Sequence, residues 1–302
     1  MLGKGGAGKS TVAAALGLNA ATERLRTLVI EVSSQHRLPH LFGIAGPRDG
    51  HRDVEVRLAP DLWTLSIDPQ HATEEYLAGQ LKVRPVVEML ARSRAFSHFT
   101  SAAPGLAELV SLGKIWSLAV ALQDDKRTPV WDRLIVDCPA TGHGIALLET
   151  AQNVEELAGG GPIRDQAARI QEVIAHPAAT GVAVVARPEE LSVTEACEAV
   201  VTLREAGLPV AAAFMNGMRH DRFHDADEPA LRRLAAEPAG GVVATAAVAS
   251  LRQLLGRRHD VAYLERLRRE TALPVQELPQ LVRRTMGPTG IAILADHLGE
   301  SR

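Results

Sequence analysis

Short apolar runs alternate with helix-forming stretches along this chain of 302 residues. A stretch rich in helix formers, residues 11–23, precedes a continuous apolar run of strand length, residues 26–32. Similar runs lie at residues 133–137, 182–186 and 210–215, each followed by turn residues and then by helical periodicity. Alternating strands and helices of this kind form a mostly parallel sheet with helices on both faces. The pattern therefore predicts a doubly wound α/β fold whose ligands bind beyond the carboxyl ends of the strands.

The rest of the chain is predicted to be largely helical. Apolar residues recur at helical spacing in its middle, which predicts an inserted helical subdomain over approximately residues 70–125. Residues 251–269 form a heavily charged helical stretch, residues 273–279 are a candidate last strand, and a terminal helix is expected near residues 291–298. Because we find no internal repeat, low-complexity block or clear linker, we expect a single domain over residues 1–302.

The composition excludes several classes of protein. Hydrophobic residues make up 46% of the chain, enough for a buried core, and a net charge of -3 gives no sign of a nucleic-acid partner. The two cysteines, Cys138 and Cys197, lie far apart, so neither a disulfide framework nor a zinc site is expected. No apolar run reaches the roughly 18 residues of a membrane span, and we find no signal peptide. We therefore expect a cytoplasmic protein.

The most informative motif lies at the N-terminus, where residues 3–11 read Gly-Lys-Gly-Gly-Ala-Gly-Lys-Ser-Thr. In the pattern G-x-x-x-x-G-K-[ST], glycines with positive φ turn backbone amides toward phosphates, and the following helix offers its N-terminal dipole. We expect Lys9 to bridge the β- and γ-phosphates, Ser10 to bind Mg²⁺ and Thr11 to lie near the α-phosphate. The motif therefore predicts that ATP and Mg²⁺ bind at Gly5, Gly6, Ala7, Gly8, Lys9, Ser10 and Thr11. The alternative is a glycine-rich turn with a surface lysine.

The start of the chain departs from this pattern. A phosphate loop normally follows a buried strand, but only Met1 and Leu2 precede Gly3, so the strand that should anchor the loop is missing from the sequence. We expect either a start codon placed too far downstream or a truncated chain, so that the native N-terminus is longer and contains this strand. A weakly anchored loop is the expected consequence.

A second candidate residue lies at the end of the run at residues 133–137. A hydrolase with this loop needs a carboxylate at the end of another strand to hold the magnesium shell, and Asp137 occupies such a position. Pro139, Thr141 and Gly142 follow it in a loop. We therefore predict that Asp137 is a catalytic and metal-site residue; the alternative is a strand-ending turn aspartate.

Four segments together resemble the arsenical-pump-driving and tail-anchored-protein-targeting ATPases. The run Lys4-Gly-Gly-Ala-Gly-Lys-Ser-Thr11 resembles their deviant phosphate loop, and Asp137-Cys-Pro-Ala-Thr-Gly-His143 resembles their second switch. Pro188-Glu-Glu-Leu-Ser-Val-Thr-Glu195 is similar to the start of a family helix, and Phe214-Met-Asn216 is similar to the strand end that recognises adenine. The resemblance runs from Lys4 to about Asn216 and implies a P-loop NTPase that hydrolyses ATP.

The resemblance also implies how the protein assembles, and Lys4 has the main part in this. It implies a dimer that closes over two nucleotides, in which Lys4 reaches the phosphates of the partner subunit as an arginine finger does elsewhere. It also implies that Asn216 reads adenine, and no Asn-Lys-x-Asp signature for guanine occurs in the chain. Without the resemblance, Lys4 would be interpreted as a solvated loop lysine. The dimer is either a homodimer or a heterodimer with a paralogous ATPase.

The first switch departs from the family pattern. Alignment on Leu38 and Phe42-Gly43 sets Ser33 at the place of the aspartate that orients the attacking water, and serine is no general base at neutral pH without activation. Glu31, two residues earlier, is a candidate substitute through water or magnesium; the alternative is a helix- or strand-capping surface glutamate, and His36 is another candidate polar group. The leading hypothesis is therefore a slow dimeric ATPase, and the second is a nucleotide-gated scaffold that scarcely hydrolyses ATP, such as one half of a heterodimer.

The sequence also argues against two known substrates of the resembled proteins. Arsenite needs a cluster of soft ligands, which Cys138 and Cys197 do not supply, and each is expected to be a small buried apolar residue. A tail-anchored client needs a long apolar groove, typically rich in methionine, and the chain has five methionines and no C-x-x-C pair. We expect neither substrate, and the client or membrane partner stays open.

Overall fold

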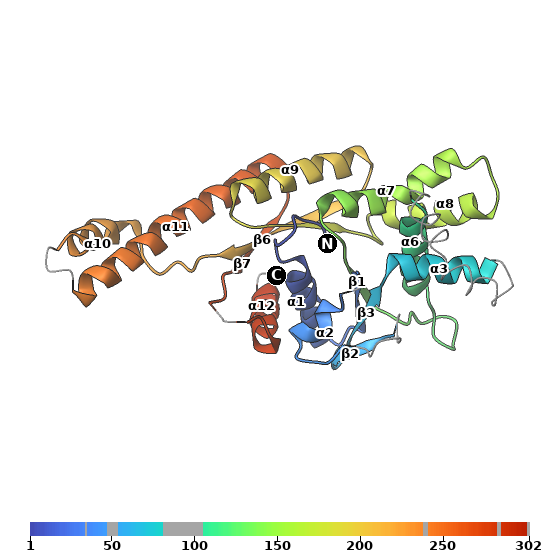
Figure 1. Ribbon diagram of the computed structural model, residues 1–302, viewed down its shortest axis with the longest axis horizontal. Coiled ribbons are helices and arrows are strands. Elements are labelled where there is room, and N and C mark those ends of the chain that lie inside the picture. The colour runs from blue at the N-terminus through green and yellow to red at the C-terminus, as the bar shows by residue number, and fades with distance from the viewer. Residues whose placement is uncertain (34, 47–53, 81–104, 238–240, 283–284, 301–302) are drawn as a thin grey trace, which may run out of the picture.

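The computed structural model describes residues 1–33, 35–46, 54–80, 105–237, 241–282 and 285–300 (Figure 1). The described strands are β1 (Thr27–Val32), β2 (Val56–Ala59), β3 (Leu62–Ile67), β4 (Arg133–Asp137), β5 (Val182–Ala186), β6 (Val210–Met218) and β7 (Val275–Pro279). The described helices are α1 (Lys9–Thr22), α2 (Arg37–Leu41), α3 (Pro69–Gln80), α6 (Leu106–Ala119), α7 (Thr141–Leu157), α8 (Pro162–Ala175), α9 (Glu190–Glu205), the short 3₁₀ helix η1 (Asp225–Asp227), α10 (Glu228–Ala235), α11 (Val242–Thr271) and α12 (Pro288–Glu300).

The strands form two sheets that meet at the first two residues of the chain. The first sheet has the order β2-β3-β1-β4 and the second the order β5-β6-β7, and every pair except β2 with β3 is parallel. Between β4 and β5, the Met1 nitrogen donates to the Val136 carbonyl (2.7 Å), and Leu2 pairs in parallel with Val184. The predicted mostly parallel α/β fold is thus confirmed, and Met1 and Leu2 lie where the strand before the loop was expected.

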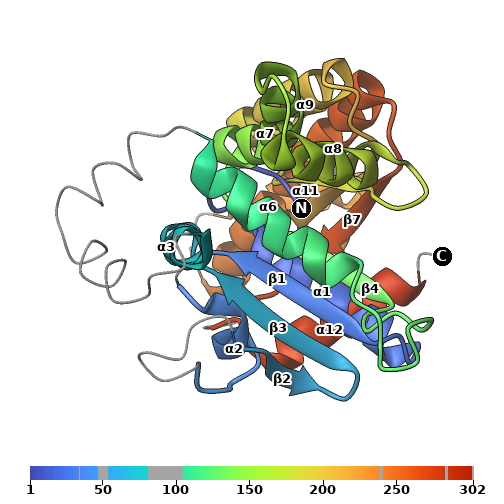
Figure 2. The same cartoon turned by 90° about the vertical axis from the view of Figure 1, so that its right-hand side faces the viewer.

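The alternation of side chains along β1 explains why helices cover both faces of the first sheet. Leu28 and Ile30 are fully buried in a cluster with partly buried side chains of α6, whereas Val29, between them, packs in a second cluster with α1 and α12. Successive strand residues point to opposite faces, so a continuous apolar strand must be covered on both sides. Figure 2 shows α6 and α1 on opposite faces of this sheet.

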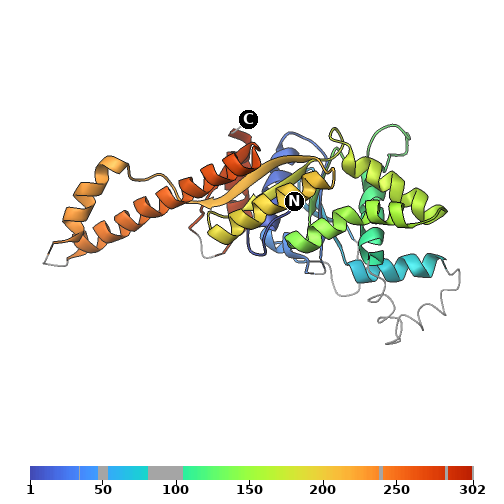
Figure 3. The ribbon, with the colours of Figure 1, turned by 90° about the horizontal axis from the view of Figure 1, so that it is seen from above.

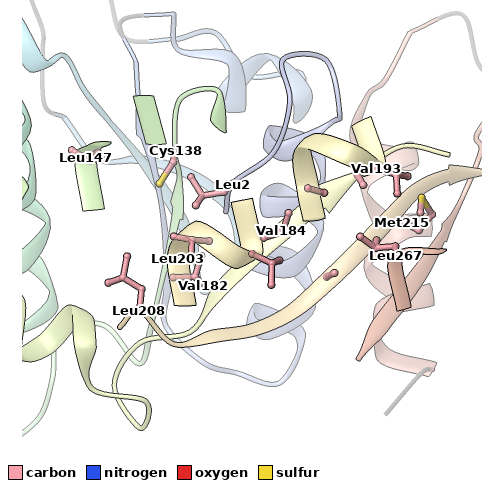
Figure 4. Close-up of a cluster of buried hydrophobic side chains, with 14 of the residues drawn as sticks. Leu2, Cys138, Leu147, Val182, Val184, Val193, Leu203, Leu208, Met215 and Leu267 are labelled. Atoms are coloured by element: carbon pink, nitrogen blue, oxygen red, sulfur yellow. The ribbon is translucent and has the colours of Figure 1, made fainter. Parts of the chain in front are cut away.

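Leu2 lies in the largest core cluster, which joins the two sheets (Figure 4). Its side chain is fully buried, and a Cβ atom on Gly144 of α7 would lie 2.2 Å from Leu2 Cδ2. Met1 and Leu2 also line a largely apolar cavity of about 210 Å³, together with Val136 of β4 and Val182 of β5. The two sheets are therefore held together at the end nearer the phosphate loop.

The helices that flank the sheets reach two opposite ends of the molecule (Figures 1 and 3). Helices α3, α6, α7 and α8 gather at one end, and α10 packs along α11 at the other. Of the predicted helical subdomain, α3 and the 14-residue helix α6 are described, and residues 81–104 lie outside the described residues. Among the described residues, no helix combines the length and the apolar composition needed to cross a membrane.

One pair of strands was not predicted from the sequence, and one helix is longer than predicted. Strands β2 and β3 form an antiparallel hairpin around Pro60 and Asp61, where Asp61 has φ 54°. The Pro-Asp turn between two apolar segments was an available signal. Helix α11 begins at Val242, well before the predicted residue 251. Its start was not predicted because its first turns consist largely of alanine and valine and carry no charge pattern. The predicted strands at 133–137 and 182–186 are confirmed.

Candidate functional site

The glycine-rich loop runs from Leu2 in the sheet to the first turn of α1. Gly8 caps α1 in the left-handed region with φ 91°, which favours glycine, and the helix has no acidic residue in its first turn. Gly5 and Gly6 are exposed at the tip, and the Ala7 amide donates to the Lys4 carbonyl (3.1 Å). Thr11 follows in the first turn, half-buried. The loop therefore presents a positive helix end beside exposed backbone, a suitable site for an anion.

Lys9 lies back along this loop. Its Nζ donates to the carbonyl oxygens of Gly3 (3.0 Å) and Lys4 (3.4 Å). The pKa of Lys9 is lowered, mainly by burial. The negative charge of Asp137 opposes this effect and raises the pKa. A cation that is half removed from water and bonded only to neutral carbonyls gains free energy when a phosphate replaces them.

Ser10 and Asp137 join the loop to the end of β4. The Ser10 hydroxyl donates to Asp137 Oδ2 (2.5 Å), while Asp137 Oδ1 is buried and has no hydrogen-bond partner among the described residues. Burial raises the pKa of Asp137, against the Ser10 hydrogen bond and the charge of Lys9. A buried carboxylate oxygen without a donor is costly, and a hard cation or its water shell relieves that cost. The residues present thus fit Mg²⁺.

Glu31 lies beside Asp137, because their strands pair in register at these residues. Its side chain is buried, and Oε2 accepts the amides of Arg37 (2.8 Å) and Leu38 (3.5 Å) at the start of α2 and the hydroxyl of Ser66 (3.4 Å). Burial is the largest cause of its raised pKa, and the two amide bonds oppose it. These contacts are those of a helix-capping glutamate, but the residue is buried and does not lie at the surface, as that alternative had expected.

Lys4 is paired within its own chain. Its Nζ lies 2.8 Å from Oε1 of Glu195 on α9, and about a third of each side chain is exposed, 33% and 39%. A surface ion pair of this kind contributes only about 0–1 kcal/mol. The ion pair therefore holds the Lys4 side chain beside α9 and breaks at little cost in free energy.

Asn216 reaches the loop from the second sheet. Its Nδ2 donates to the Ala7 carbonyl (2.8 Å), across 209 positions of sequence. The structure thus brings Lys4, Lys9, Ser10, Asp137 and Asn216 to one loop, with Glu31 one strand pair away.

The N-terminal half of the chain is similar to a known protein family. Residues 1–159 of the chain match the family model described as Anion-transporting ATPase. The chain belongs to this family of anion-transporting ATPases. Membership confirms the predicted family and its P-loop NTPase fold, and it supports a nucleotide-binding ATPase at the level of the family.

Several curated proteins are similar to this chain. ATPase BagA of Mycobacterium tuberculosis is 32% identical over 217 residues, which cover 71% of this chain and 63% of that protein. The Arsenical pump-driving ATPase of Acidiphilium multivorum is 26% identical over 242 residues, covering 74% of this chain and 40% of that protein. ATPase GET3 of Podospora anserina is 24% identical over 154 residues, covering 51% of this chain and 42% of that protein. The chain spans less than two thirds of the length of these relatives.

Two contacts in this member of the anion-transporting ATPase family were not predicted from the sequence. Glu195 was part of a quoted motif, but nothing in the motif predicts that it pairs with Lys4. Ser66, on the missed strand β3, lies opposite Glu31 in register. The expectation for the cysteines also needs correction, because only Cys138 is buried. Cys197 is partly buried, and burial together with Glu270 raises its thiol pKa to about 11.

Proposed function

We propose that the protein is an ATP-binding, Mg²⁺-dependent ATPase that couples its nucleotide state to dimer conformation and partner binding. The observation that carries the proposal is the pair Ser10 and Asp137 beside Lys9: a hydroxyl bound to a buried carboxylate whose second oxygen has no partner among the described residues. A phosphate loop followed by such a carboxylate has the parts that P-loop NTPases use for phosphate and metal.

Each residue then has a defined part in hydrolysis. Lys9 leaves the Gly3 and Lys4 carbonyls and binds the β- and γ-phosphates, where its charge stabilises the transition state. Ser10 and Asp137 hold Mg²⁺ and its water shell. When bound, Mg²⁺ neutralises charge on the phosphate oxygens. The amides of Gly5, Gly6, Ala7 and Gly8 surround the phosphates, Thr11 lies near the α-phosphate, and Asn216 contacts adenine.

The two other predicted catalytic residues, Lys4 and Glu31, have different roles in this proposal. Lys4 acts in a dimer, homomeric or with a paralogue, by exchanging Glu195 of its own chain for the phosphates of the partner subunit. Glu31 caps α2 in this proposal, because Oε2 accepts two helix amides, and its catalytic role stays a prediction that Glu31→Gln tests. Arsenite, nucleic acid and a tail-anchored client are not part of the proposal. The cytoplasmic location stays a prediction.

A second candidate function is a nucleotide-gated scaffold with very slow turnover. The observation that favours it is Ser33, which stands where the water-orienting aspartate is expected and whose Oγ accepts the Gln35 amide (3.0 Å). A hydroxyl engaged in a local turn does not activate water. The two candidates share nucleotide binding and differ in turnover.

Phosphate release from the purified protein tests the enzyme proposal, with Lys9→Ala as the background. We expect ATP- and Mg²⁺-dependent release above that background, and a further rise in Ser33→Asp. Release no higher than in Lys9→Ala, with ATP still bound, would favour the scaffold. If wild-type protein binds no ATP, both candidates are wrong.

Mixing two inactive variants tests whether Lys4 acts across a dimer. In a mixed dimer, the Lys9→Ala subunit lends its intact Lys4 to the Lys4→Ala subunit, whose own Lys9 is intact. We expect each variant alone to be inactive and an equal mixture to regain about a quarter of the wild-type activity, because about half of the dimers are mixed and each mixed dimer has one complete site of two. No recovery, with mixed dimers demonstrated by differential tags, would place the action of Lys4 within its own chain.

A further inference from the structure

Among the described residues, one side-chain hydrogen bond joins the second sheet to the phosphate loop: Asn216 Nδ2 donates to the Ala7 carbonyl (2.8 Å). We propose that Asn216 is a positioning residue for the phosphate loop, so that it sets the affinity for the phosphates whatever base they carry. This inference rests on the proposed nucleotide site and goes beyond the adenine contact assigned to Asn216 there.

The Ala7 carbonyl needs this donor. Ala7 is 2% exposed, and the first carbonyl used by α1 is that of Gly8, which accepts the Val12 amide (2.9 Å). Among the described residues, the Asn216 amide is the one donor that reaches the Ala7 oxygen. A buried carbonyl without a donor is destabilising, so loss of Asn216 favours other conformations of the loop.

The contact extends to the next residue of the loop. A Cβ atom built on Gly8 would lie 2.2 Å from Asn216 Nδ2, which means that the amide packs directly against the Gly8 backbone. Gly8 is the N-cap of α1, and its neighbours carry the amides that face a bound anion. Asn216 therefore supports the part of the loop that binds phosphate.

The chain that follows Asn216 holds it in this orientation from its C-terminal side. The register of β6 against β7 shifts between Asn216 and Met218, and Gly217 between them has φ 86°. A bulge of this kind redirects the side chain beside it. Just beyond, the amide and guanidinium of Arg219 both bind the carboxylate of Asp260, which is fully buried on α11.

The amide group has enough hydrogen-bonding capacity for both roles. An asparagine side chain offers two N–H donors and one carbonyl oxygen, and the Ala7 contact uses one donor. The second donor and Oδ1 stay available for the Hoogsteen edge of adenine. Asn216 thus connects recognition of the base with the shape of the phosphate cradle.

Calorimetry tests this role by measuring two affinities. One is the affinity for Mg²⁺-ATP, and the other is that for Mg²⁺ with inorganic tripolyphosphate, which has no base. In Asn216→Ala we expect both to fall by about tenfold, the equivalent of ~1.4 kcal/mol. Asn216→Asp should show the same double loss, since a carboxylate of the same shape cannot donate to Ala7. Asn153→Ala is the matched control, because Asn153 is exposed on α7. A loss confined to ATP, or no loss, would overturn the proposal.

Hydrogen exchange of the loop without nucleotide gives a readout that does not depend on the proposed function. We expect the amides of residues 5–8 to exchange about tenfold faster in both Asn216 variants than in wild-type protein and in Asn153→Ala. Unchanged exchange would overturn the positioning role even if ATP binds. Faster exchange in a protein that binds neither ligand would support the role and contradict the nucleotide site.

Discussion

The first sheet ends in buried charge where it meets the phosphate loop, whereas the second sheet ends there in a neutral amide. Asp137 and Glu31 lie at the ends of β4 and β1, and burial raises the pKa of both. Asn216 lies near the end of β6 and carries no charge. In the proposed function this difference separates two tasks: Asp137 of the first sheet gains free energy when metal and phosphate arrive, and Asn216 of the second sheet fixes the shape of the loop.

Replacing Asp137, a charged residue of the first sheet, should have the largest effect, and the quantity affected is the rate of hydrolysis. In Asp137→Asn, we expect the rate of hydrolysis to fall by about 10³-fold, since the metal-holding carboxylate is lost while the side chain keeps its shape. Steady-state phosphate release at saturating ATP and varied Mg²⁺ measures it.

The matched control for this variant is Asp124→Asn, which removes an exposed carboxylate outside the site and should leave the rate unchanged. A rate for Asp137→Asn within about tenfold of wild type would show that the first sheet does not supply the magnesium-holding group.

Leu2 tests whether the two sheets form one frame. Leu2→Ala removes a fully buried side chain between them, so we expect the free energy of unfolding to fall by about 3 kcal/mol. Urea unfolding followed by circular dichroism measures the change. Leu157→Ala, at a side chain that is 86% exposed, should change it by less than about 0.5 kcal/mol. Equal effects of the two variants would contradict a structural role of this junction.

The smallest expected effect concerns Glu31 and depends on pH. Its pKa is raised in the folded protein, so the unfolded chain loses this proton first, and folding stability falls as pH rises from the unfolded pKa to the raised one. Glu31→Gln does not titrate, and its amide oxygen can still accept the α2 amides. We therefore expect the melting temperature of the variant, relative to wild type, to increase by a few degrees as pH rises above about 4.

Hydrolysis by Glu31→Gln separates the two interpretations of this residue. A capping glutamate predicts a rate within about twofold of wild type, because glutamine keeps the cap. A loss as large as that of Asp137→Asn would assign Glu31 to the chemistry and extend the catalytic role of the first sheet.

Much of the site could be predicted from the sequence because the chemistry lies at the ends of regular elements. The loop motif fixed Lys9 and Ser10, and the apolar run that ends at Asp137 placed a carboxylate at the same sheet edge. The hairpin of β2 and β3 was missed although a Pro-Asp turn marks it. The partner of Lys4 could not be predicted, because Glu195 lies 191 positions away along the chain, and its ion pair depends on how α9 packs.

The sequence by itself determined the α/β class, the phosphate loop and the strand-ending residues, because strand and helix periodicities and glycine conformation are local properties. Tertiary structure alone decided that Met1 and Leu2 join two sheets, that Glu31 caps α2 and that Asn216 supports Ala7. Each of these depends on groups far apart in the chain that meet only when the sheets are assembled, and their hydrogen bonds follow from the need to satisfy buried polar groups.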